Sequence, residues 1–545
     1  MKKIAKYILV AIAPALLLSS CIKETTPMNG AATESQVMNS PLALQALVAA
    51  IPTAMNLPAT YNSSMHCDFG YPAIRMITDA MLEEKIVVGD NTGYDWFGAW
   101  AQGRSQGNSY AYAQYFWYFY YKWIKNTNDM IRMINDMEVA NGGLTDEQKA
   151  YLGIAYTYRS LYYLDLVRFY EFKPNNYTSR PEVEGLSCVL ALETESMEAA
   201  RENGRAKVED VYAQIFADLA KAEELLAGYK RTSIAMPDLS VVYGLYAKAY
   251  LEYGEKDNSA FAKAAEYARK AVAKGGYTPL TQKQWEDPVN GFNNHASNNS
   301  WMWALTTSSE NIGNLHNYFA HSSQEAEYGY APLSMPAVLS SFFDRVADND
   351  FRKHSWIDPK REYAYQSCYP NAEEYVASLR DYSALKIRPG GGDYSDYAVG
   401  NCGEVNMMRM EEMLFIEAEA EGRANLENGK ALLKAIMDKR ILDGSYVCAA
   451  TDFKTFQEEL IFQKRVEFWG EGVCMFDCKR ANIGMTRGYE GTNAPATYCL
   501  NTEGRSPFWN IVITRQETNN NLKIPETQNN PDPTGTVDLW IAPAE

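Results

Sequence analysis

Apolar side chains recur every three or four residues through most of the chain, which is the spacing of one face of an α-helix. Each segment with this pattern predicts one helix, and the segments are 43–55, 71–85, 112–137, 145–170 and 208–226. The segments 238–253 and 260–274 predict a helical hairpin, because alanines at the crossing let two helices approach closely. A last helix pair is expected over 407–425 and 429–441, so the fold class is mainly α.

The helical period disappears in two long segments, 88–110 and 277–336. Both combine glycine or asparagine with many large aromatic side chains. Long loops in compact domains are usually functional or disordered, and aromatic residues disfavour disorder. We therefore interpret the two segments as functional loops. After them we expect a short helix over 335–343 and short strands within 363–389.

The N-terminus carries three lysines, followed by an apolar run over 8–18 that is too short to span a bilayer. This order is typical of a secretory signal peptide. The run ends in Leu18-Ser19-Ser20-Cys21, which resembles a bacterial lipobox, where the cysteine is lipidated. We expect a lipoprotein signal peptide over 1–20, a lipidated tether over 21–40 and a single helical domain over 41–545.

The formal net charge of the chain is −17 at pH 7. This acidic balance argues against a nucleic-acid partner, whose phosphates need a basic surface. The cysteines other than Cys21 contain no CxxC motif for a metal or redox site. An exported chain permits disulfides, and their pairing stays open. Cys474 and Cys478 lie one helical turn apart, where a direct disulfide is geometrically awkward.

The sequence contains no HExxH zinc motif, no Walker loop and no Rossmann glycine triplet. Asp344, Asp348 and Asp350 are spaced loosely like calcium ligands but lack the glycine and glutamate of an EF-hand. We interpret them as a solvated helix end with an ion pair to Arg352. We therefore expect no enzyme activity, metal or cofactor, while the 68 acidic residues leave a glycosidase pair of carboxylates open as an alternative.

Segment 458–480 interleaves charged side chains with large apolar ones. The charged set is Arg465, Glu467, Glu471, Asp477, Lys479 and Arg480. If the segment packs, some of these charges must pair, because a buried unpaired charge is very costly. The segment is then either a catalytic acid–base cluster or an ion-paired structural clamp. No nucleophile, metal motif or phosphate loop accompanies it, and this favours the clamp.

Aromatic side chains on the two long loops are the remaining candidate chemistry. Flat tyrosine and tryptophan faces pack against the apolar faces of sugar rings, while nearby aspartate, asparagine and arginine bond to the hydroxyls. The alternative is that these aromatics are buried beneath the loops as a satellite core. Burial is favoured for any one residue, but the whole set exceeds what a loop can bury. We therefore expect some of them to be exposed.

The order of several motifs resembles the SusD/RagB family of Bacteroidetes outer-membrane lipoproteins over essentially the whole chain. The matching positions are Cys21, Ile124 with Asn128, Arg159 with Tyr162, Asp350 with Arg352, 417–420, 465–480 and Ile524 with Pro525. Each motif alone is weak, but their order along one chain is specific. Val473 and Cys474 depart from the family pattern, in which an arginine and an aromatic residue are commoner, and this difference should affect local packing.

The resemblance implies an α-helical scaffold of tetratricopeptide-like pairs with irregular, loop-rich insertions and a few short strands. The scaffold would include 208–275 and 407–480, and the insertions would be 88–110 and 277–336. Members of the family bind glycans at the cell surface and cap a SusC-like TonB-dependent transporter. The resemblance therefore implies a carbohydrate-uptake lipoprotein, anchored in the outer membrane through Cys21 and facing the cell exterior.

The ligand site of this family is built from loops and varies too much for its residues to be transferred. We predict that Trp96 and Trp100 are stacking platforms for a glycan. The further candidates are Tyr94, Tyr318 and Tyr328 as aromatic contacts, and Asp68 and Arg75 as hydroxyl contacts. Two alternatives remain, a RagB-like lipoprotein that captures peptides and, with weaker support, a surface glycosidase.

Overall fold

The computed structural model describes residues 38, 40–57, 68–89, 96–101, 106–310 and 315–542. The expected signal peptide, Cys21 and Tyr94 lie outside the described residues. Residue contacts divide the chain into two units, Met1–Leu47 and Val48–Glu545. The following description concerns the second unit, and the expectation of one domain from residue 41 onward stays a prediction.

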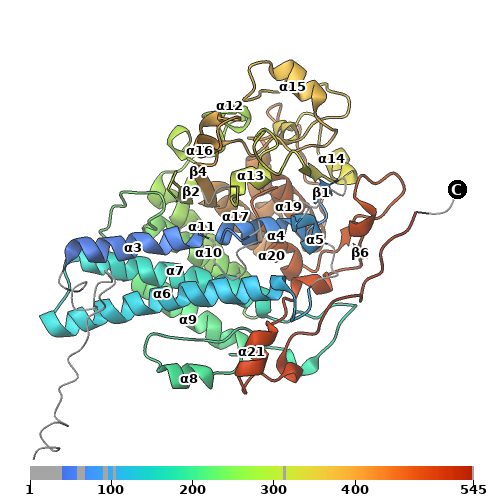
Figure 1. Ribbon diagram of the computed structural model, residues 1–545. Helices are drawn as coiled ribbons and strands as arrows, with labels where there is room; N and C mark the ends of the chain where they lie inside the picture. The colour runs from blue at the N-terminus through green and yellow to red at the C-terminus, as the bar shows by residue number, and fades with distance from the viewer. Residues whose placement is uncertain are drawn as a thin grey trace, which may run out of the picture. The chain divides into compact units, whose positions relative to one another are not determined.

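Long antiparallel helices build the scaffold of the second unit, and each packs mainly against its neighbours in the series (Figure 1). The series is α6 (Ala111–Asn141), α7 (Asp146–Tyr170), α9 (Val208–Leu225), α10 (Leu239–Tyr253), α11 (Ala260–Gly275), α17 (Met410–Ala424), α18 (Leu426–Met437) and α19 (Phe453–Glu467). This serial packing of helical pairs confirms the expectation of a mainly α, tetratricopeptide-like fold.

Local sequence signals set the ends of these helices. The Thr145 hydroxyl accepts from Gln148 N at 3.2 Å, and the Gln148 side chain accepts from Thr145 N at 2.9 Å, which forms the expected capping box of α7. Asp238 and Asn425 cap α10 and α18 in a similar way. Gly276 ends α11 with φ = 62°, a left-handed conformation that glycine adopts without strain.

Shorter helices connect and cover the scaffold. They are α4 (Tyr71–Ala80), α5 (Trp96–Ala101), α8 (Met197–Arg201), α12 (Gln282–Glu286), α13 (Tyr318–Ser322), α14 (Ser340–Arg345), α15 (Ala372–Ser378), α16 (Tyr397–Gly400), α20 (Cys474–Arg480) and α21 (Arg515–Asn520). The helix α3 (Pro41–Met55) crosses the boundary between the two units. The chain also forms a 3₁₀ turn, η3, over Phe351–Ser355. None of the helices in the described part of the chain is both long and apolar enough to cross a membrane.

Three small antiparallel sheets complete the described structure. They pair β1 (Lys85–Gly89) with β3 (Ser334–Val338), β2 (Trp301–Thr307) with β4 (Gly403–Arg409), and β5 (Met485–Thr486) with β6 (Asn501–Thr502). The segments that form each sheet are far apart in the sequence, except for β5 and β6. These sheets therefore tie the loop insertions to one another and to the helical scaffold.

Two sequence-based expectations for the insertions are wrong. A helix was expected over 335–343, but Ser334–Val338 forms β3 and the helix α14 begins only at Ser340. The long-range pairing with β1 overrides the local helical pattern there. Strands were expected within 363–389, but this segment contains helix α15 and only isolated bridges at Ser383 and Ala384.

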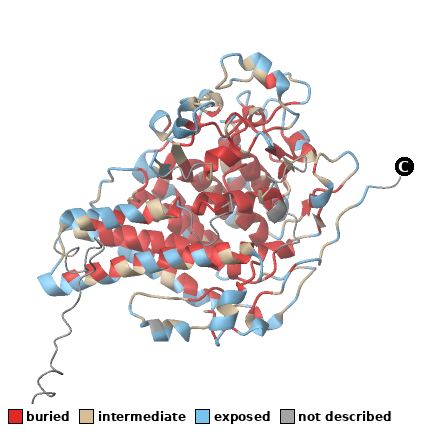
Figure 2. Cartoon of the chain, viewed as in Figure 1, coloured by how far each residue is buried: buried red, intermediate tan, exposed pale blue. Residues whose placement is uncertain are grey.

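A balanced network of buried ions lies among α17, α19 and the loops that cover them. Its members are the cations Arg352, Lys386, Arg409 and Arg440 and the anions Asp350, Glu411, Glu467 and Glu471. All of them are buried, within the interior that Figure 2 shows in red. The prediction that charges of segment 458–480 pair inside the protein is confirmed.

The described cysteines are all free thiols, and most of them are buried. They include Cys474 and Cys478, for which the spacing argued against a direct disulfide. The described fold is therefore held by packing, hydrogen bonds and ion pairs.

Candidate functional site

The pairing of β1 with β3 brings the two loop insertions together. The strands are antiparallel, and Gly89 at the end of β1 faces Ser334 at the start of β3. The chain that leaves β1 and the chain that enters β3 therefore run from the same end of this sheet. Trp96, shortly after β1, and Tyr330, shortly before β3, meet there with ring centroids 5.3 Å apart.

His321 from α13 lies at the centre of an aromatic cluster. Its imidazole stacks on Tyr330 at 4.9 Å and on Phe69 at 5.6 Å, with interplanar angles of 20° and 15°. Trp96 and Phe97 approach the same imidazole with their ring planes nearly perpendicular to it, at 5.8 and 5.2 Å. We call these five residues the Trp96 cluster. Edge-to-face and stacked contacts of this kind hold aromatic rings in fixed orientations.

The inner and outer members of the Trp96 cluster differ in exposure. Phe69, Phe97 and His321 are buried, whereas Trp96 and Tyr330 are only half-buried. The inner rings therefore act as a packed base that supports the two outer rings. Such an arrangement presents apolar ring surface to solvent without a large loss of side-chain entropy on binding, because the rings are already held in place.

Backbone contacts fix the position of Tyr330. The Ala320 carbonyl oxygen accepts from Tyr330 N at 2.7 Å and from Ala331 N at 3.0 Å. This approach requires glycine at 329, because a Cβ there would lie 2.5 Å from the same oxygen. On the other side, Asn317 caps the N-terminus of α13 by accepting from Ala320 N.

Polar groups adjoin the Trp96 cluster. Asp68 precedes Phe69 and is buried, and His316 precedes α13 and is half-buried. Burial lowers the pKa of His316, although the nearby charge of Asp68 opposes the shift. His316 is therefore predominantly neutral at pH 7 and is able both to donate and to accept a hydrogen bond.

Two other predicted site residues, Arg75 and Tyr318, line a small hollow together with Glu471, and this hollow has room for only about one water molecule. Both side chains are buried. The Tyr318 hydroxyl donates to Gly470 O at 3.0 Å, and the Arg75 guanidinium donates to the backbone carbonyls of Glu471 and Asn406. In this structure their polar ends serve the fold, and the Trp96 cluster does not contain them.

Tyr328 lies apart from the Trp96 cluster. It is half-buried, and its hydroxyl points toward Gly400, where a Cβ would lie only 2.2 Å from that oxygen. Burial and the charge of Asp393 raise the pKa of Tyr328, so its hydroxyl stays protonated. Trp100 belongs to α5 by its backbone, but its side chain, like Tyr94, lies outside what the structure describes.

Sequence reasoning did not select His321 or Tyr330. The loop composition pointed to the right segment, and Tyr330 was one of its many aromatics. The signal that separates it from the others is its place four residues before β3, whose pairing with β1 is a long-range contact. Such a contact leaves no local pattern in a single sequence.

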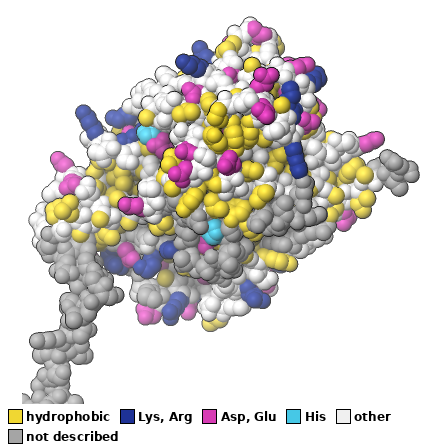
Figure 3. Space-filling view, turned by 45° about the horizontal axis from the view of Figure 1, so that its top comes forward, with side chains coloured by type: hydrophobic (Ala, Val, Ile, Leu, Met, Phe, Trp, Pro, Cys, Tyr) yellow, Lys and Arg dark blue, Asp and Glu magenta, His cyan; other side chains and the backbone are white. Residues whose placement is uncertain are grey.

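The space-filling view shows a hydrophobic area on the face it presents, with acidic side chains around it (Figure 3). An exposed apolar area with a polar rim is typical of a ligand or partner surface. Across the described residues, no group of three or more His, Cys, Asp or Glu side chains is arranged to hold a metal ion.

Comparisons with known proteins agree with this architecture. Residues 76–251 match the SusD-like family model described as starch-binding associating with outer membrane. No curated protein matches the sequence.

The fold is also similar to solved structures. A SusD-like carbohydrate binding protein from Bacteroides vulgatus is 21% identical with a TM-score of 0.67, and the match covers 89% of this chain and 97% of that one. A SusD superfamily protein from Bacteroides thetaiotaomicron is 16% identical with a TM-score of 0.66, over 90% and 99% of the two chains. One from Parabacteroides distasonis is 17% identical with a TM-score of 0.62, over 90% and 98%. Residues 76–251 are therefore similar to the SusD-like family, and the fold over about nine tenths of the chain is the one that these SusD-like structures share.

Proposed function

We propose that the protein binds an oligosaccharide or polysaccharide, and that the Trp96 cluster is the binding surface. The observation that carries this proposal is the meeting of two half-exposed rings, Trp96 and Tyr330, on a rigid aromatic base at the junction of two loops. The match to a family described as starch-binding and the fold shared with a carbohydrate binding protein support it.

The chemistry of the Trp96 cluster suits a sugar. One face of a pyranose ring carries mainly C–H groups, which pack on an aromatic face, while its hydroxyls need hydrogen-bond partners at the edge. Trp96 and Tyr330 would supply the apolar contact. Such an arrangement would hold a glycan without breaking any of its bonds.

Location and partner are further parts of this proposal. We propose that Cys21 is lipidated, that the lipid anchors the protein in the outer membrane facing the cell exterior, and that the protein works with a SusC-like TonB-dependent transporter. Replacing Cys21 by serine should move the protein from the membrane fraction to the soluble fraction. Persistence of the Cys21→Ser protein in membranes would argue against the lipid anchor.

Binding of glycans is tested with the soluble form that begins after Cys21. A panel of plant, host and microbial glycans is screened by affinity electrophoresis, and the glycan that is retained is used for calorimetry. Trp96→Ala should weaken binding, whereas Trp540→Ala serves as the matched control, because Trp540 is also half-buried but packs against a different cluster. Release of reducing sugar during the incubation would instead support the glycosidase alternative, and peptides that co-purify with the protein would support peptide capture.

A further inference from the structure

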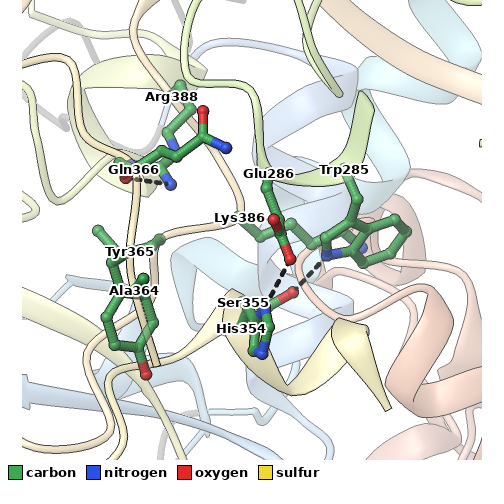
Figure 4. A pocket seen from close by; sticks show the side chains of 10 residues that line it. Trp285, Glu286, His354, Ser355, Ala364, Tyr365, Gln366, Lys386 and Arg388 are labelled. Carbon is green, nitrogen blue, oxygen red and sulfur yellow. Dashed lines mark hydrogen bonds and ion pairs between the residues drawn. The ribbon is translucent and has the colours of Figure 1, made fainter. Parts of the chain in front are cut away.

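A second recess lies between α12, the 3₁₀ turn η3 and the chain segments 363–366 and 440–443. It consists of two hollows, and His354 lines both of them. We call it the His354 groove, and Figure 4 shows the smaller hollow. The smaller hollow has room for only about one water molecule. The larger one, with a volume of about 360 Å³, is within the range of small-molecule sites in proteins. None of its residues belongs to the Trp96 cluster.

Tyrosine rings form one wall of the His354 groove. The Tyr363 ring lies 4.3 Å from the His354 imidazole, and Tyr365 lies 6.0 Å from Tyr363. The Tyr365 hydroxyl is occupied, since it donates to Trp356 O at 2.7 Å and accepts from Asp358 N at 2.6 Å. Tyr363 is half-buried and lines the larger hollow, so its ring is the one that a ligand can reach.

Glu286 lines the smaller hollow beside His354, the residue that lines both hollows (Figure 4). Its Oε1 accepts from Gln282 Nε2 at 2.8 Å and lies 2.5 Å from His354 Nδ1. Burial alone would raise the pKa of Glu286, but the hydrogen bonds from His354 and Gln282 lower it, so this carboxyl is ionised at neutral pH. Both bonds end on Oε1, which leaves Oε2 as an acceptor for a ligand.

The cations that line the His354 groove are already committed to buried acids. Arg388 pairs with Glu325, Lys386 with Glu471 at 2.7 Å, and Arg440 with Glu467 at 2.8 Å. They therefore provide no uncompensated positive charge for an anionic ligand.

The groups on the open side are acids and amides instead. Asp348 and Asp443 line the larger hollow together with Asn349. The Asn349 amide donates to Asp443 Oδ2 at 2.8 Å and to Ser445 Oγ at 3.0 Å, which keeps its own carbonyl oxygen as an acceptor. A ring wall combined with several acceptors and no available cation favours a ligand rich in neutral hydroxyl donors, and it disfavours phosphates and uronic acids.

We propose that the His354 groove is a second carbohydrate site, in which a neutral sugar ring stacks on Tyr363 and donates hydroxyl hydrogen bonds to Glu286 and Asn349. The inference rests on the groove's own rings, acceptors and volume. It holds whether or not the Trp96 cluster binds a glycan.

The test uses the full soluble chain with the Trp96→Ala substitution, so that the first proposed site is weakened. Neutral hexaoses of glucose, xylose, mannose and galactose, and an acidic hexagalacturonate, are titrated in a calorimeter. At least one neutral hexaose should bind, and hexagalacturonate should not. Adding Tyr363→Ala should raise the Kd for that hexaose about tenfold, and Glu286→Gln should raise it as well.

Tyr397→Ala in the same background is the matched control, because Tyr397 is a surface tyrosine, 44% exposed, outside the groove. This variant should bind as the parent does. Absence of binding by all neutral hexaoses, or equal binding by the Tyr363→Ala and Tyr397→Ala variants, would overturn the proposal. If Trp96→Ala alone leaves the glycan affinity of the protein unchanged, the Trp96 cluster is not the glycan site. The comparison of the Tyr363→Ala and Tyr397→Ala variants still tests the His354 groove in that case.

Discussion

Glu467 and Arg409 form an ion pair that is fully buried, with Arg409 Nη1 2.7 Å from Glu467 Oε1. Arg440 and Arg352 reach the other carboxylate oxygen at 2.8 and 3.2 Å. Burial alone would raise the pKa of Glu467, but Arg440 and Arg409 hold it well below its ordinary value. This one carboxylate therefore contacts three guanidinium groups from different parts of the chain, within a network in which Asp350, Glu411 and Glu471 supply the remaining negative charges.

The first prediction concerns this carboxylate. Glu467→Gln leaves the buried network with one uncompensated positive charge, so it should destabilise the fold by about 3–5 kcal/mol. Urea unfolding followed by tryptophan fluorescence measures the change. Glu458→Gln is the control on the same helix, because the Glu458 side chain is exposed and its pair with Lys454 contributes little. A stable Glu467→Gln protein that has lost glycan binding would show that this segment belongs to the ligand site.

The second prediction concerns pH. Burial raises the pKa of Asp79 to about 6, although Lys85 acts to lower it. In the unfolded chain an aspartate titrates near 4. Between pH 4 and pH 6 Asp79 is ionised in the unfolded chain but still protonated in the folded protein. The stabilisation that this carboxyl contributes to folding is therefore fully present below pH 4 and is lost as the pH rises through 6.

Asp79→Asn removes this titration, while the amide oxygen of the replacement keeps an acceptor for Gly472 N, which bonds to Asp79 at 3.0 Å. Between pH 4 and 6 the wild type should lose about 3 kcal/mol relative to the variant. Urea unfolding at a series of pH values measures the difference. A constant difference across this range would mean that Asp79 is ionised in the folded protein throughout.

The third prediction concerns the glycine that follows Glu471. Gly472 has φ = 69°, and a Cβ there would lie 2.3 Å from Arg75 O, so Gly472→Ala forces the backbone of α4 away. We expect Gly472→Ala to lower the free energy of unfolding by more than the roughly 1–2 kcal/mol that the left-handed conformation alone costs a residue with a side chain. Gly491→Ala isolates that strain, because Gly491 has φ = 80° with nothing within 4 Å of its would-be Cβ. Equal melting temperatures for the two variants would contradict this account.

The helical scaffold could be predicted because its signals are local. The apolar spacing of 145–170 and the capping box of Thr145 with Gln148 act within a few residues of each other, and α7 follows them closely. That the charged side chains of segment 458–480 form ion pairs could also be predicted, because burying an unpaired charge is very costly. Their partners Arg352, Arg409 and Arg440 come from elsewhere in the chain, and only the fold identifies them.

The candidate site could be predicted only in part. Aromatic content marked both loops, and Trp96 was selected from the first of them. Its neighbours His321 and Tyr330 are set by the β1–β3 pairing, whose five-residue strands carry no distinctive pattern. The same pairing explains why the helix expected over 335–343 does not form at its start.

The central claim is that Trp96 and Tyr330 form a glycan-binding surface. The most direct measurement is the Kd of the soluble protein for its best glycan, compared among the wild type, Trp96→Ala, Tyr330→Ala and the control Trp540→Ala. The account predicts that each of the first two substitutions raises the Kd about tenfold or more, with the unfolding midpoint nearly unchanged, while the control binds as the wild type does. Unchanged affinity in both Trp96→Ala and Tyr330→Ala would contradict it.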